Sequence, residues 1–416
     1  MAVHVIDQAN RCLNCKKPLC RQGCPIQTEI PQMIADFKEG KLKEAGERLF
    51  ENNPLSLVCS LVCDHEKQCE GHCILGKKGN PVHVSSIENY ISDIMFDNLK
   101  IECAPKNGKK VAVIGAGPAG ITIAILLTKE GYEVTIFDSK DKIGGVLQYG
   151  IPAFRLPKSI LKRYKKKLIE IGVKIRPNTA IGSALQIKDL VRDGYQSIFI
   201  GTGVWRPKTL GIKGESFGNV HYAIDYLANP KVYDLGDSVA VIGVGNSAMD
   251  VARTAIRNGA RKVTLYARGQ KSDASQAEIM YTKLDGATFE FGKQIIEITD
   301  EGPVFAPVLY NEEGKSIGIS EEREQVNADS TIISISQGPK SKLVNTTEGL
   351  KATQNGLLMT DENGQTTVPG IFASGDVVLG ARTVVEAVAY SKVVAKAMDT
   401  FMKEGKTIQL SGSDWE

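Results

Sequence analysis

The chain has 416 residues, a length that corresponds to about two to four domains. Hydrophobic residues make up 42% and charged residues 24%, and the formal net charge is only +3. This composition excludes a disordered, collagenous or coiled-coil chain, and gives no whole-molecule attraction to nucleic acid or to a membrane surface. No apolar run reaches the roughly 20 residues of a membrane span. Residues 1–15 lack the apolar core of a secretory signal.

Eight of the nine cysteines lie between positions 12 and 73, and none lies beyond position 103. We therefore expect a cytoplasmic protein whose thiols bind metal rather than form disulfides. The spacings are C-x2-C-x4-C-x3-C-P from Cys12 to Pro25 and C-x3-C-x5-C-x3-C from Cys59 to Cys73. They favour two iron–sulfur clusters. Zinc and purely structural cysteines stay as alternatives, although the x4 and x5 gaps fit zinc ribbons poorly.

The stretch between the two cysteine groups shows helical spacing of its apolar residues. Residues 30–54 predict two helices with a break at Gly40, and residues 80–100 predict a further helix. Residues 100–110 have the composition of a linker. The amino-terminal region is therefore predicted to be a small helical domain.

A dinucleotide-binding motif begins at residue 109. A buried strand over 109–115 runs into the turn Gly115-Ala-Gly-Pro-Ala-Gly120, a helix that Gly131 closes, and a second strand that ends at Asp138. Gly115 permits the tight turn, Gly117 admits the pyrophosphate, and Gly120 lets the helix pack closely on the strand. We expect Asp138 to accept a hydrogen bond from a ribose hydroxyl.

A second motif of this kind begins at Asp237 and contains Gly243, Gly245 and Ala248. No acid ends its second strand; Arg268 and Lys271 stand there instead. Cations at this place suit a 2′-phosphate, so NADP(H) is favoured over NAD(H), which stays open. The alternative is that Arg268 is only a solvated charge at the end of a strand.

A third segment, near the carboxyl terminus, places Gly375 and Asp376 after a short strand and before a helix that begins near Thr383. The carboxylate is expected to bind a ribityl hydroxyl, and the helix N-terminus to face the flavin. Because no cysteine follows Cys103, electrons cannot leave through a dithiol as in thioredoxin-reductase-like flavoproteins. We expect them to leave through the clusters.

The segments RCLNCKKPLCRQGCP, GAGPAG, IGGVLQYGIPAFRLP, GVGNSAMDVARTA and FASGDVV resemble one family. It includes the small subunit of glutamate synthase, the N-terminal half of dihydropyrimidine dehydrogenase and the large subunit of NADH-dependent ferredoxin:NADP oxidoreductase. The resemblance covers residues 10 to about 405 and implies an α/β fold with two Rossmann-like dinucleotide-binding domains after a small α-helical iron–sulfur domain. The predicted domains are 1–105 for [4Fe–4S], 109–205 and 336–405 for FAD, 206–335 for NAD(P)H, and a tail at 406–416.

The resemblance also implies the residues that hold the cofactors. One [4Fe–4S] cluster would be held by Cys12, Cys15, Cys20 and Cys73. The other would be held by Cys24, Cys63, Cys69 and a non-cysteine ligand, Glu88, whose alternative role is that of a solvated helix residue. Cys59 would be a spare thiol near a cluster, and Cys103 a linker thiol.

The flavin and nicotinamide sites are implied in the same way. FAD would lie against Gly115, Gly117, Pro118, Ala119, Gly120, Asp138, Gly145, Arg155, Gly375, Asp376 and Thr383. NADP(H) or NAD(H) would lie against Gly243, Gly245, Asn246, Ser247, Ala248 and Arg268. No side-chain acid or base is needed for hydride transfer, so we name no catalytic residue.

The predicted protein is an electron-transfer subunit of an oxidoreductase, because its domains leave no room for a separate substrate-reducing domain. Its partner would be a catalytic reductase or synthase subunit, or ferredoxin, in a hetero-oligomer that binds neither nucleic acid nor membrane. The alternatives are a subunit specifically of a dihydropyrimidine dehydrogenase or glutamate synthase, a zinc-binding nucleotide-sensing regulator, and an oxidase. A basic run in 162–167 is interpreted as a solvated face or a partner-docking face.

Overall fold

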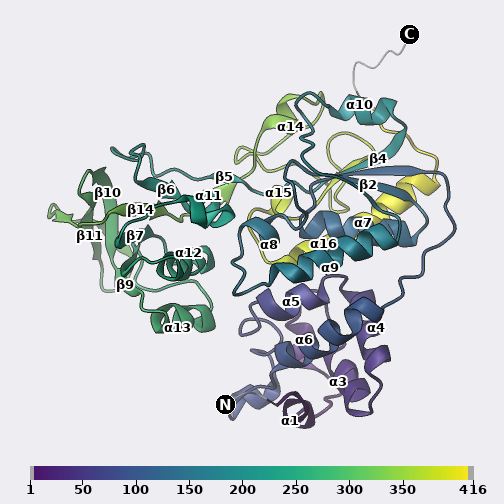
Figure 1. Cartoon of the computed structure of the whole chain (residues 1–416), viewed down its shortest axis with the longest axis horizontal. Helices are drawn as coiled ribbons and strands as arrows, with labels where there is room; N and C mark the ends of the chain where they lie inside the picture. Colours follow the sequence, from purple (N-terminus) through teal and green to yellow (C-terminus); the bar gives the residue numbers. More distant parts are fainter. Residues whose placement is uncertain (1–3, 411–416) are drawn as a thin grey trace. The chain divides into compact units, whose positions relative to one another are not determined.

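The computed structural model describes residues 4–410 (Figure 1). The chain forms two compact units. Unit 1 comprises the chain up to Gln148, Ala153–Val204 and the chain from Gly338 on, and unit 2 comprises Tyr149–Pro152 and Trp205–Gln337. The boundaries predicted for the individual domains stay predictions, and most of the predicted tail, 411–416, lies outside the described residues.

The amino-terminal part of unit 1 is helical, as the cysteine-rich region predicted. Its elements are α1 (Val5–Asn10), α2 (Leu19–Gln22), α3 (Ile30–Lys38), α4 (Leu42–Asn52), α5 (Ser56–Val62), η1 (Ile74–Lys77), α6 (Val84–Met95) and η2 (Phe96–Asn98). Gly40 separates α3 from α4 with φ at +77°, a conformation that favours glycine. Met33, Leu49 and Ile87 pack in one buried core, so the apolar stripes of these helices face one another.

The rest of unit 1 is a five-stranded parallel sheet in the order β16-β4-β1-β2-β3. The strands are β1 (Lys110–Ile114), β2 (Glu133–Phe137), β3 (Lys174–Arg176), β4 (Tyr195–Ile200) and β16 (Ile371–Ala373). The helices are α7 (Pro118–Lys129), α8 (Val146–Tyr149), α9 (Lys158–Glu170), α10 (Ile187–Arg192), α14 (Lys342–Asn345), α15 (Asp376–Leu379) and α16 (Val384–Lys403). β16 pairs with β4 in parallel. The FAD-type domain is therefore split in sequence, with all of unit 2's sheet strands between β4 and β16.

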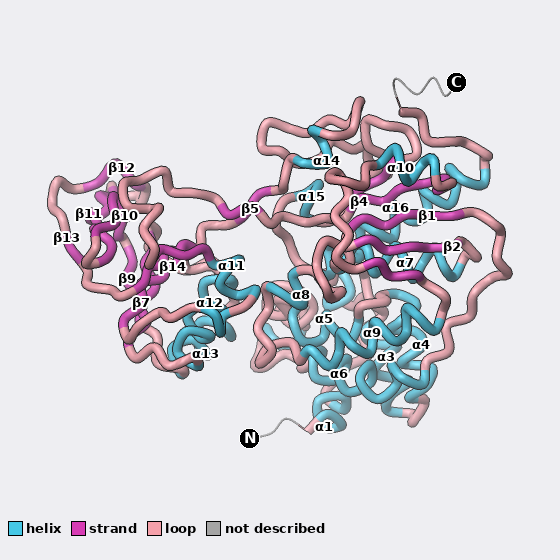
Figure 2. Tube along the Cα trace, turned by 45° about the horizontal axis from the view of Figure 1, so that its top comes forward, coloured by secondary structure: helices cyan, strands magenta, loops and turns pink. Residues whose placement is uncertain are grey.

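Helices α7 and α16 lie together beside this sheet (Figures 1 and 2). Tyr132 donates a hydrogen bond to Asp399 Oδ1 at 2.9 Å, and Lys109 Nζ donates to the carbonyl of Met402. These contacts fix the carboxyl-terminal helix against the first βαβ unit, which brings its N-terminus to the glycine-rich turn.

The basic run on α9 is neither fully solvated nor fully free to dock a partner. Lys167 is 7% exposed and donates to the carbonyls of Asp97 at 3.2 Å and Leu99 at 3.0 Å. Arg163 pairs with Asp93 and Asp97. Arg163 and Lys167, two of the five Lys and Arg residues in 162–167, therefore hold the helical domain to the sheet domain. The packing of these domains brings η2 beside α9.

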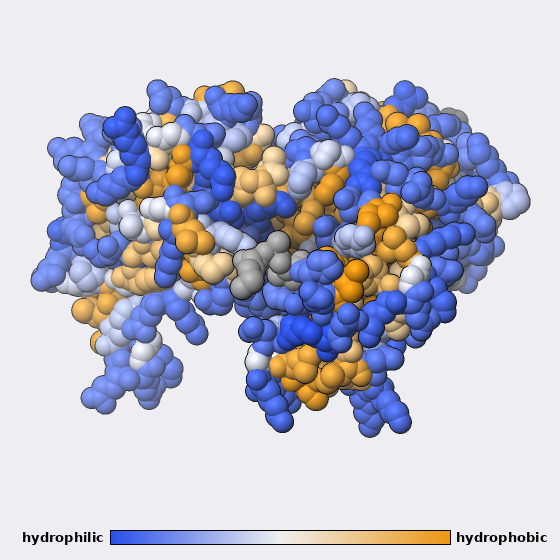
Figure 3. All heavy atoms as spheres, turned by 60° about the horizontal axis from the view of Figure 1, so that its bottom comes forward, coloured by the Kyte–Doolittle hydropathy of each residue, from blue (hydrophilic) through white to orange (hydrophobic). Residues whose placement is uncertain are grey.

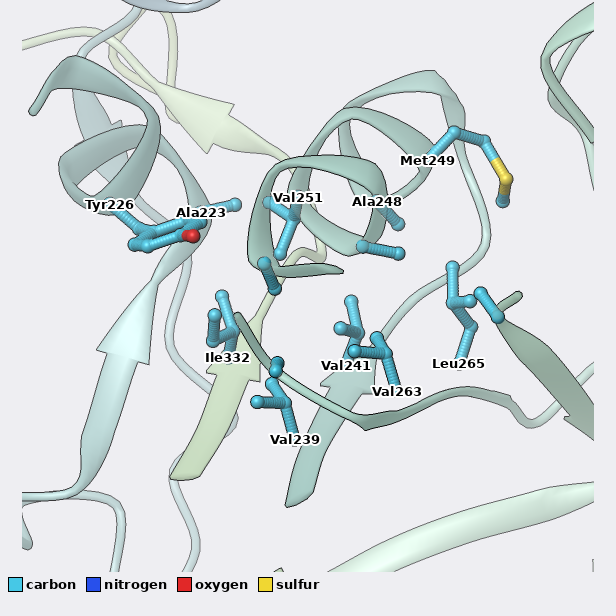
Figure 4. Packing of buried hydrophobic residues seen from close by; sticks show 14 of the residues in the cluster. Ala223, Tyr226, Val239, Val241, Ala248, Met249, Val251, Val263, Leu265 and Ile332 are labelled. Atoms are coloured by element: carbon cyan, nitrogen blue, oxygen red, sulfur yellow. The ribbon is translucent and has the colours of Figure 1, made fainter. Parts of the chain in front are cut away.

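Unit 2 contains a second parallel sheet in the order β6-β14-β7-β8-β9. The strands are β6 (Val220–Tyr222), β7 (Ser238–Ile242), β8 (Lys262–Ala267), β9 (Thr288–Phe291) and β14 (Ser330–Ile333), and the helices are α11 (Ala223–Ala228), η3 (Pro230–Val232), α12 (Asn246–Arg257) and α13 (Gln276–Leu284). Figure 4 shows one face of α12 directed at the strands, with Ala248 and Val251 above Val241 and Val263. The apolar face of α12 thus forms the core of this unit.

One part of unit 2 was not anticipated from the sequence. Residues 293–325 form an antiparallel sheet of β10 (Lys293–Thr299), β11 (Gly302–Tyr310), β12 (Ser316–Ile319) and β13 (Glu324–Gln325). Two short strands, β5 (Arg206–Pro207) and β15 (Gln337–Gly338), pair where the chain passes between the units. Among residues 4–410, no helix has the length and apolar character required to cross a membrane.

Candidate functional site

The first glycine-rich turn has the backbone that the fingerprint demands. Gly115 has φ at +105°, and its N–H donates to the carbonyl of Phe137 at 2.8 Å. A Cβ at Gly115 would lie 2.5 Å from the carbonyl oxygen of Gly201, and one at Gly120 only 1.9 Å from that of Gly115. Both positions therefore require glycine. Pro118 and Ala119 form the first turn of α7, which Gly117 precedes as the N-cap residue.

Segments distant in the sequence surround this turn. Gly144 N–H donates to the carbonyl of Ala116 at 2.7 Å. A Cβ at Gly145 would lie 2.9 Å from the Cα of Gly117, and one at Gly375 would lie 3.2 Å from the Cβ of Ala119. A Cβ at Gly117 would have its nearest neighbouring atoms at 4.0 Å. The structure thus brings three predicted flavin segments together and leaves open the position meant to admit the pyrophosphate.

Two carboxylates lie at this turn. Asp138 follows β2, and its Oδ2 accepts a hydrogen bond from Ala116 N–H at 2.6 Å while its Oδ1 accepts one from Lys140 N–H at 2.8 Å. Burial raises the pKa of Asp138. Asp376 opens α15, and burial raises its pKa to about 6, although its Oδ1 accepts a hydrogen bond from Arg382 N–H. A carboxylate has about four lone-pair sites, so both retain capacity for a ligand hydroxyl.

Thr383 is the N-cap of α16, one residue before the helix begins at Val384. Its side chain donates to Glu386 Oε2 at 2.6 Å and accepts from Glu386 N–H at 3.4 Å, which makes a capping box. The capping box orients the helix N-terminus, whose partial positive charge favours an electron-rich ligand. Arg155 is half-buried in the loop between α8 and α9, and its contact with a flavin stays a prediction.

The turn in unit 2 has the same backbone as the first turn, and its first glycine is equally required, because a Cβ at Gly243 would lie 2.2 Å from the carbonyl oxygen of Ser334. Gly243 has φ at +129°, and its N–H donates to the carbonyl of Tyr266 at 2.9 Å. Gly245 caps α12 with φ −82° and ψ 177°, close to the −77° and −174° of Gly117. A Cβ at Gly245 would meet nothing within 4 Å. Ala248, the third fingerprint position, is fully buried.

The polar residues predicted at this turn are accessible. Asn246 and Ser247 are exposed at the start of α12, and Asn246 Oδ1 accepts from Ser275 N–H at 3.1 Å. Arg268 is exposed one residue after β8, and its carbonyl accepts a hydrogen bond from Tyr310. Tyr310 belongs to the antiparallel sheet, so that sheet fixes the backbone of the residue expected to read a 2′-phosphate.

The first cysteine set gathers around α2 and the start of η1. Burial raises the pKa of Cys12 and raises that of Cys20 to about 11, and the neighbouring thiols add to both shifts. The thiols that raise the pKa of Cys20 are those of Cys73, Cys12 and Cys15. The four residues predicted for one cluster are therefore close to one another, although Cys73 is more than fifty residues from the rest.

The second set gathers more deeply. A hydrogen bond between the thiols of Cys59 and Cys63, together with burial, holds the pKa of Cys63 well above its usual range. Burial and the charges of Glu88 and Glu70 raise the pKa of Cys69, with a smaller contribution from Cys24. Glu88 is 8% exposed, and burial raises its pKa to about 8. Glu88 is thus no solvated helix residue; it faces the thiols.

One pocket joins these groups to the carboxyl-terminal helix. Its lining includes Cys24, Cys59, Cys63, Cys69 and Glu88, and also Val385 in the first turn of α16. Val385 stands two residues after Thr383, the N-cap at the flavin-type turn. One helical turn therefore separates the second cysteine set from the segment predicted to face FAD.

The donors fit iron–sulfur clusters better than a single zinc ion. Within residues 4–410, no three His, Cys, Asp or Glu side chains converge closely enough for one metal ion. A [4Fe–4S] cluster takes one thiolate at each iron, so its ligands surround a larger group. Burial raises the pKa of Cys20, Cys69 and Glu88, so a bound metal centre of either kind would favour their ionised forms.

Several residues of the pocket were not singled out from the sequence, and His65 and Val385 are two of them. His65 lines it, and its Nε2 is buried with no hydrogen-bond partner among the described residues. Its position in the sequence between Cys63 and Cys69 could have marked it as a candidate site residue. Val385 gave no signal, because only the packing of α16 brings it to the thiols.

Comparison with known proteins agrees with this architecture. Residues 2–99 match the family model described as dihydropyrimidine dehydrogenase domain II, 4Fe-4S cluster, and residues 109–391 match the pyridine nucleotide-disulphide oxidoreductase model. The chain is 33% identical to the glutamate synthase [NADPH] small chain of Escherichia coli, covering 95% of this chain and 90% of the relative. It is also 33% identical to the NAD-dependent dihydropyrimidine dehydrogenase subunit PreT of Salmonella typhimurium, covering 96% and 94%.

Among solved structures, FprA of Mycobacterium tuberculosis in complex with NADPH has a TM-score of 0.61 at 17% identity, over 73% of this chain and 87% of that chain. This likeness supports the fold. Together, the two dinucleotide-binding domains and the 4Fe–4S domain define a flavin-dependent iron–sulfur oxidoreductase that uses a nicotinamide nucleotide. The chain belongs to the pyridine nucleotide-disulphide oxidoreductase family, in the group of the glutamate synthase small chains and PreT subunits.

Proposed function

We propose that this chain is the electron-input subunit of a larger oxidoreductase. It would take a hydride from NAD(P)H and deliver the two electrons singly to a partner protein that carries the substrate site. The relatives are named as a small chain and as a subunit, which supports a hetero-oligomer with a catalytic reductase or synthase. Ferredoxin is the other candidate acceptor.

Each group has a place among the residues above. FAD would be held at Gly115–Gly120, Asp138 and Asp376, the nicotinamide nucleotide at Gly243–Ala248 and Arg268, and the clusters by the two cysteine sets with Glu88. When bound, FAD converts a two-electron hydride into single electrons, and the clusters carry them one at a time. The chain itself binds, orients and separates these groups.

The position of Val385 is the observation that carries the proposal. It lines the pocket of the second cysteine set and lies in the first turn of the helix that Thr383 caps. Such a short protein path supports transfer between the flavin-type turn and this cysteine set. No cysteine follows Cys103, so the regions that carry the FAD-type and NAD(P)-type motifs contain no dithiol that could pass electrons on. This supports the clusters as the route by which electrons leave the flavin.

The test is anaerobic reduction of the loaded protein. NADPH or NADH should bleach the flavin absorbance and then produce the electron paramagnetic resonance signal of reduced clusters, with dithionite giving the full signal for reference. Bleaching without a cluster signal would contradict the exit route. Purification from the native host should recover a stoichiometric reductase or synthase subunit; recovery of the chain alone would favour ferredoxin.

The ligand assignment has its own control. Replacing Cys63 with Ala should remove about half of the bound iron and acid-labile sulfide, because one of two clusters would lose a ligand. Replacing Cys103, which is exposed, should leave both unchanged. Replacing Cys59 should also leave the iron content unchanged; an iron loss equal to that of Cys63→Ala would make Cys59 a ligand instead.

A further inference from the structure

The two cysteine sets differ in access to solvent. In the second set, Cys69 is 6% and Glu88 8% exposed, while Cys24 and Cys63 are partly exposed. In the first set no ligand is buried, because Cys12, Cys15, Cys20 and Cys73 are all partly exposed. An electron that leaves the chain by the shortest route to a partner's surface would therefore leave at the first set.

The surroundings of the first set are strongly basic, although the whole chain is nearly neutral at +3. Residues 11–24 contain four Lys or Arg and no Asp or Glu. Lys16 and Lys17 are exposed between Cys15 and Cys20, and Lys77 and Lys78 are exposed shortly after Cys73. We call these four lysines the lysine rim.

The lysine rim is not neutralised by the chain. None of its members forms an ion pair in the described part of the chain, residues 4–410. Lys77 lines a surface hollow together with Cys73 and Leu19; the one acid of this lining, Glu70, is buried and accepts hydrogen bonds from Ser85. Positive charge therefore concentrates where the thiols come nearest to solvent.

Apolar side chains complete this surface. Leu13 is 61% and Ile74 46% exposed, each beside a cysteine of the first set. Figure 3, which turns the helical domain toward the viewer, shows apolar patches bordered by hydrophilic side chains on this side. A small apolar centre within a charged border suits a transient encounter between redox proteins.

We propose that the lysine rim, with Leu13 and Ile74, is the docking surface for a redox protein that presents Asp and Glu around its own one-electron centre. This inference rests on the proposed function. One NAD(P)H would reduce two such acceptors: NAD(P)H + 2 acceptor(ox) → NAD(P)⁺ + 2 acceptor(red) + H⁺. Opposite charges would steer the acceptor to the first cysteine set, and salt would weaken that attraction.

The test compares two acceptors of opposite charge, a small acidic [2Fe–2S] ferredoxin and basic cytochrome c. Lys16→Glu/Lys17→Glu and, separately, Lys77→Glu/Lys78→Glu should each lower kcat/KM for the ferredoxin about 10-fold at low salt, a size within the range of electrostatic steering. The loss should shrink at high salt. Cytochrome c reduction should not fall, because it gains attraction.

The matched control is Lys162→Glu/Lys165→Glu on α9, an equal change of charge at two exposed residues of the same unit. It should leave ferredoxin reduction unchanged. An equal loss in the control, or a loss that salt does not affect, would overturn the proposal. Iron content and anaerobic bleaching by NAD(P)H, measured without acceptor, should stay at wild-type values; a failure of bleaching in the wild type would instead contradict the proposed function.

Discussion

The two dinucleotide turns share a backbone but differ in what surrounds it. In the FAD-type turn, Gly120 packs so closely on Gly115 that no Cβ fits, whereas the equivalent position in the other turn is a buried Ala248. Gly117 has neighbours at 4.0 Å, while Gly245 has none within 4 Å. The first glycine is required in both turns, since a Cβ would lie 2.5 Å from a carbonyl oxygen at Gly115 and 2.2 Å from one at Gly243, so the turns differ mainly at the third position.

The residues at the end of the second strand of each motif also differ between the two turns. Asp138 is fixed by two backbone N–H groups, whereas Ala267 stands at the corresponding place in unit 2 and the exposed Arg268 follows it. The carboxylate of Asp138 is therefore held in place by the chain, whereas Arg268 is held only through its backbone carbonyl. Each prediction below tests one part of this difference.

The largest effect is expected at the third fingerprint position. Gly120→Ala should lower the free energy of unfolding by about 1–3 kcal/mol through overpacking and should strip FAD from the purified protein. Ala248→Gly, the reciprocal change, should cost about 1 kcal/mol by helix propensity and leave flavin content unchanged. Thermal unfolding and flavin absorbance measure both. Equal effects of the two changes would show that the turns are equally tolerant.

Asp138→Ala should weaken FAD binding by about 10- to 100-fold, because the carboxylate makes charge-assisted hydrogen bonds worth about 1.5–3 kcal/mol. Titration of deflavinated protein, followed by quenching of flavin fluorescence, gives the Kd. Asp141→Ala, at an exposed acid three residues on, is the control and should bind FAD as the wild type does. Unchanged affinity in Asp138→Ala would leave its carboxylate with a purely structural role at Ala116.

Arg268→Ala should raise the KM for NADPH about 10-fold, which corresponds to about 1.4 kcal/mol, and leave the KM for NADH almost unchanged. The measurement is steady-state reduction of an artificial acceptor with each nucleotide. Arg261→Ala, at the opposite end of the same strand, should change neither. An equal rise for both nucleotides would remove the phosphate-reading role from Arg268.

The smallest effect concerns pH. Burial raises the pKa of Asp376 to about 6 in the folded protein, above its unfolded value, so its ionisation costs stability as the pH rises toward and through 6. Asp376→Asn removes that cost. Its advantage in Tm over the wild type, about 2–4 °C at most, should grow between about pH 4, near the unfolded pKa, and about pH 6, and should level off by about pH 7. A pH-independent difference would mean that Asp376 ionises as freely as in the unfolded chain.

The sequence predicted the local elements that chain neighbours define. The helices on either side of Gly40, the strands that lead into Gly115 and Gly243, and the positions of Asp138 and Asp376 all follow from short-range patterns that the structure contains. The antiparallel sheet of residues 293–325 was not predicted, although β10 and β11 are seven and nine residues long, because only the dinucleotide motif of this domain was recognised in the sequence. The basic run on α9 was interpreted as a solvated face or a partner-docking face, since a sequence does not show that Asp97 and Leu99 present carbonyls to Lys167.

The sequence by itself determined the cofactor classes, because glycine turns and cysteine spacings are local requirements of the groups they bind. Only the tertiary structure decided that Glu88 is buried among the thiols rather than solvated, and that Val385 lines the pocket of the second set. The grouping of Cys73 with Cys12, Cys15 and Cys20 was implied by the family resemblance, and the structure places these four thiols near one another. The positions of Glu88 and Val385 depend on the packing of α6 and α16 against the cysteine loops. Such packing arises from the burial of whole helix faces, which no single segment encodes.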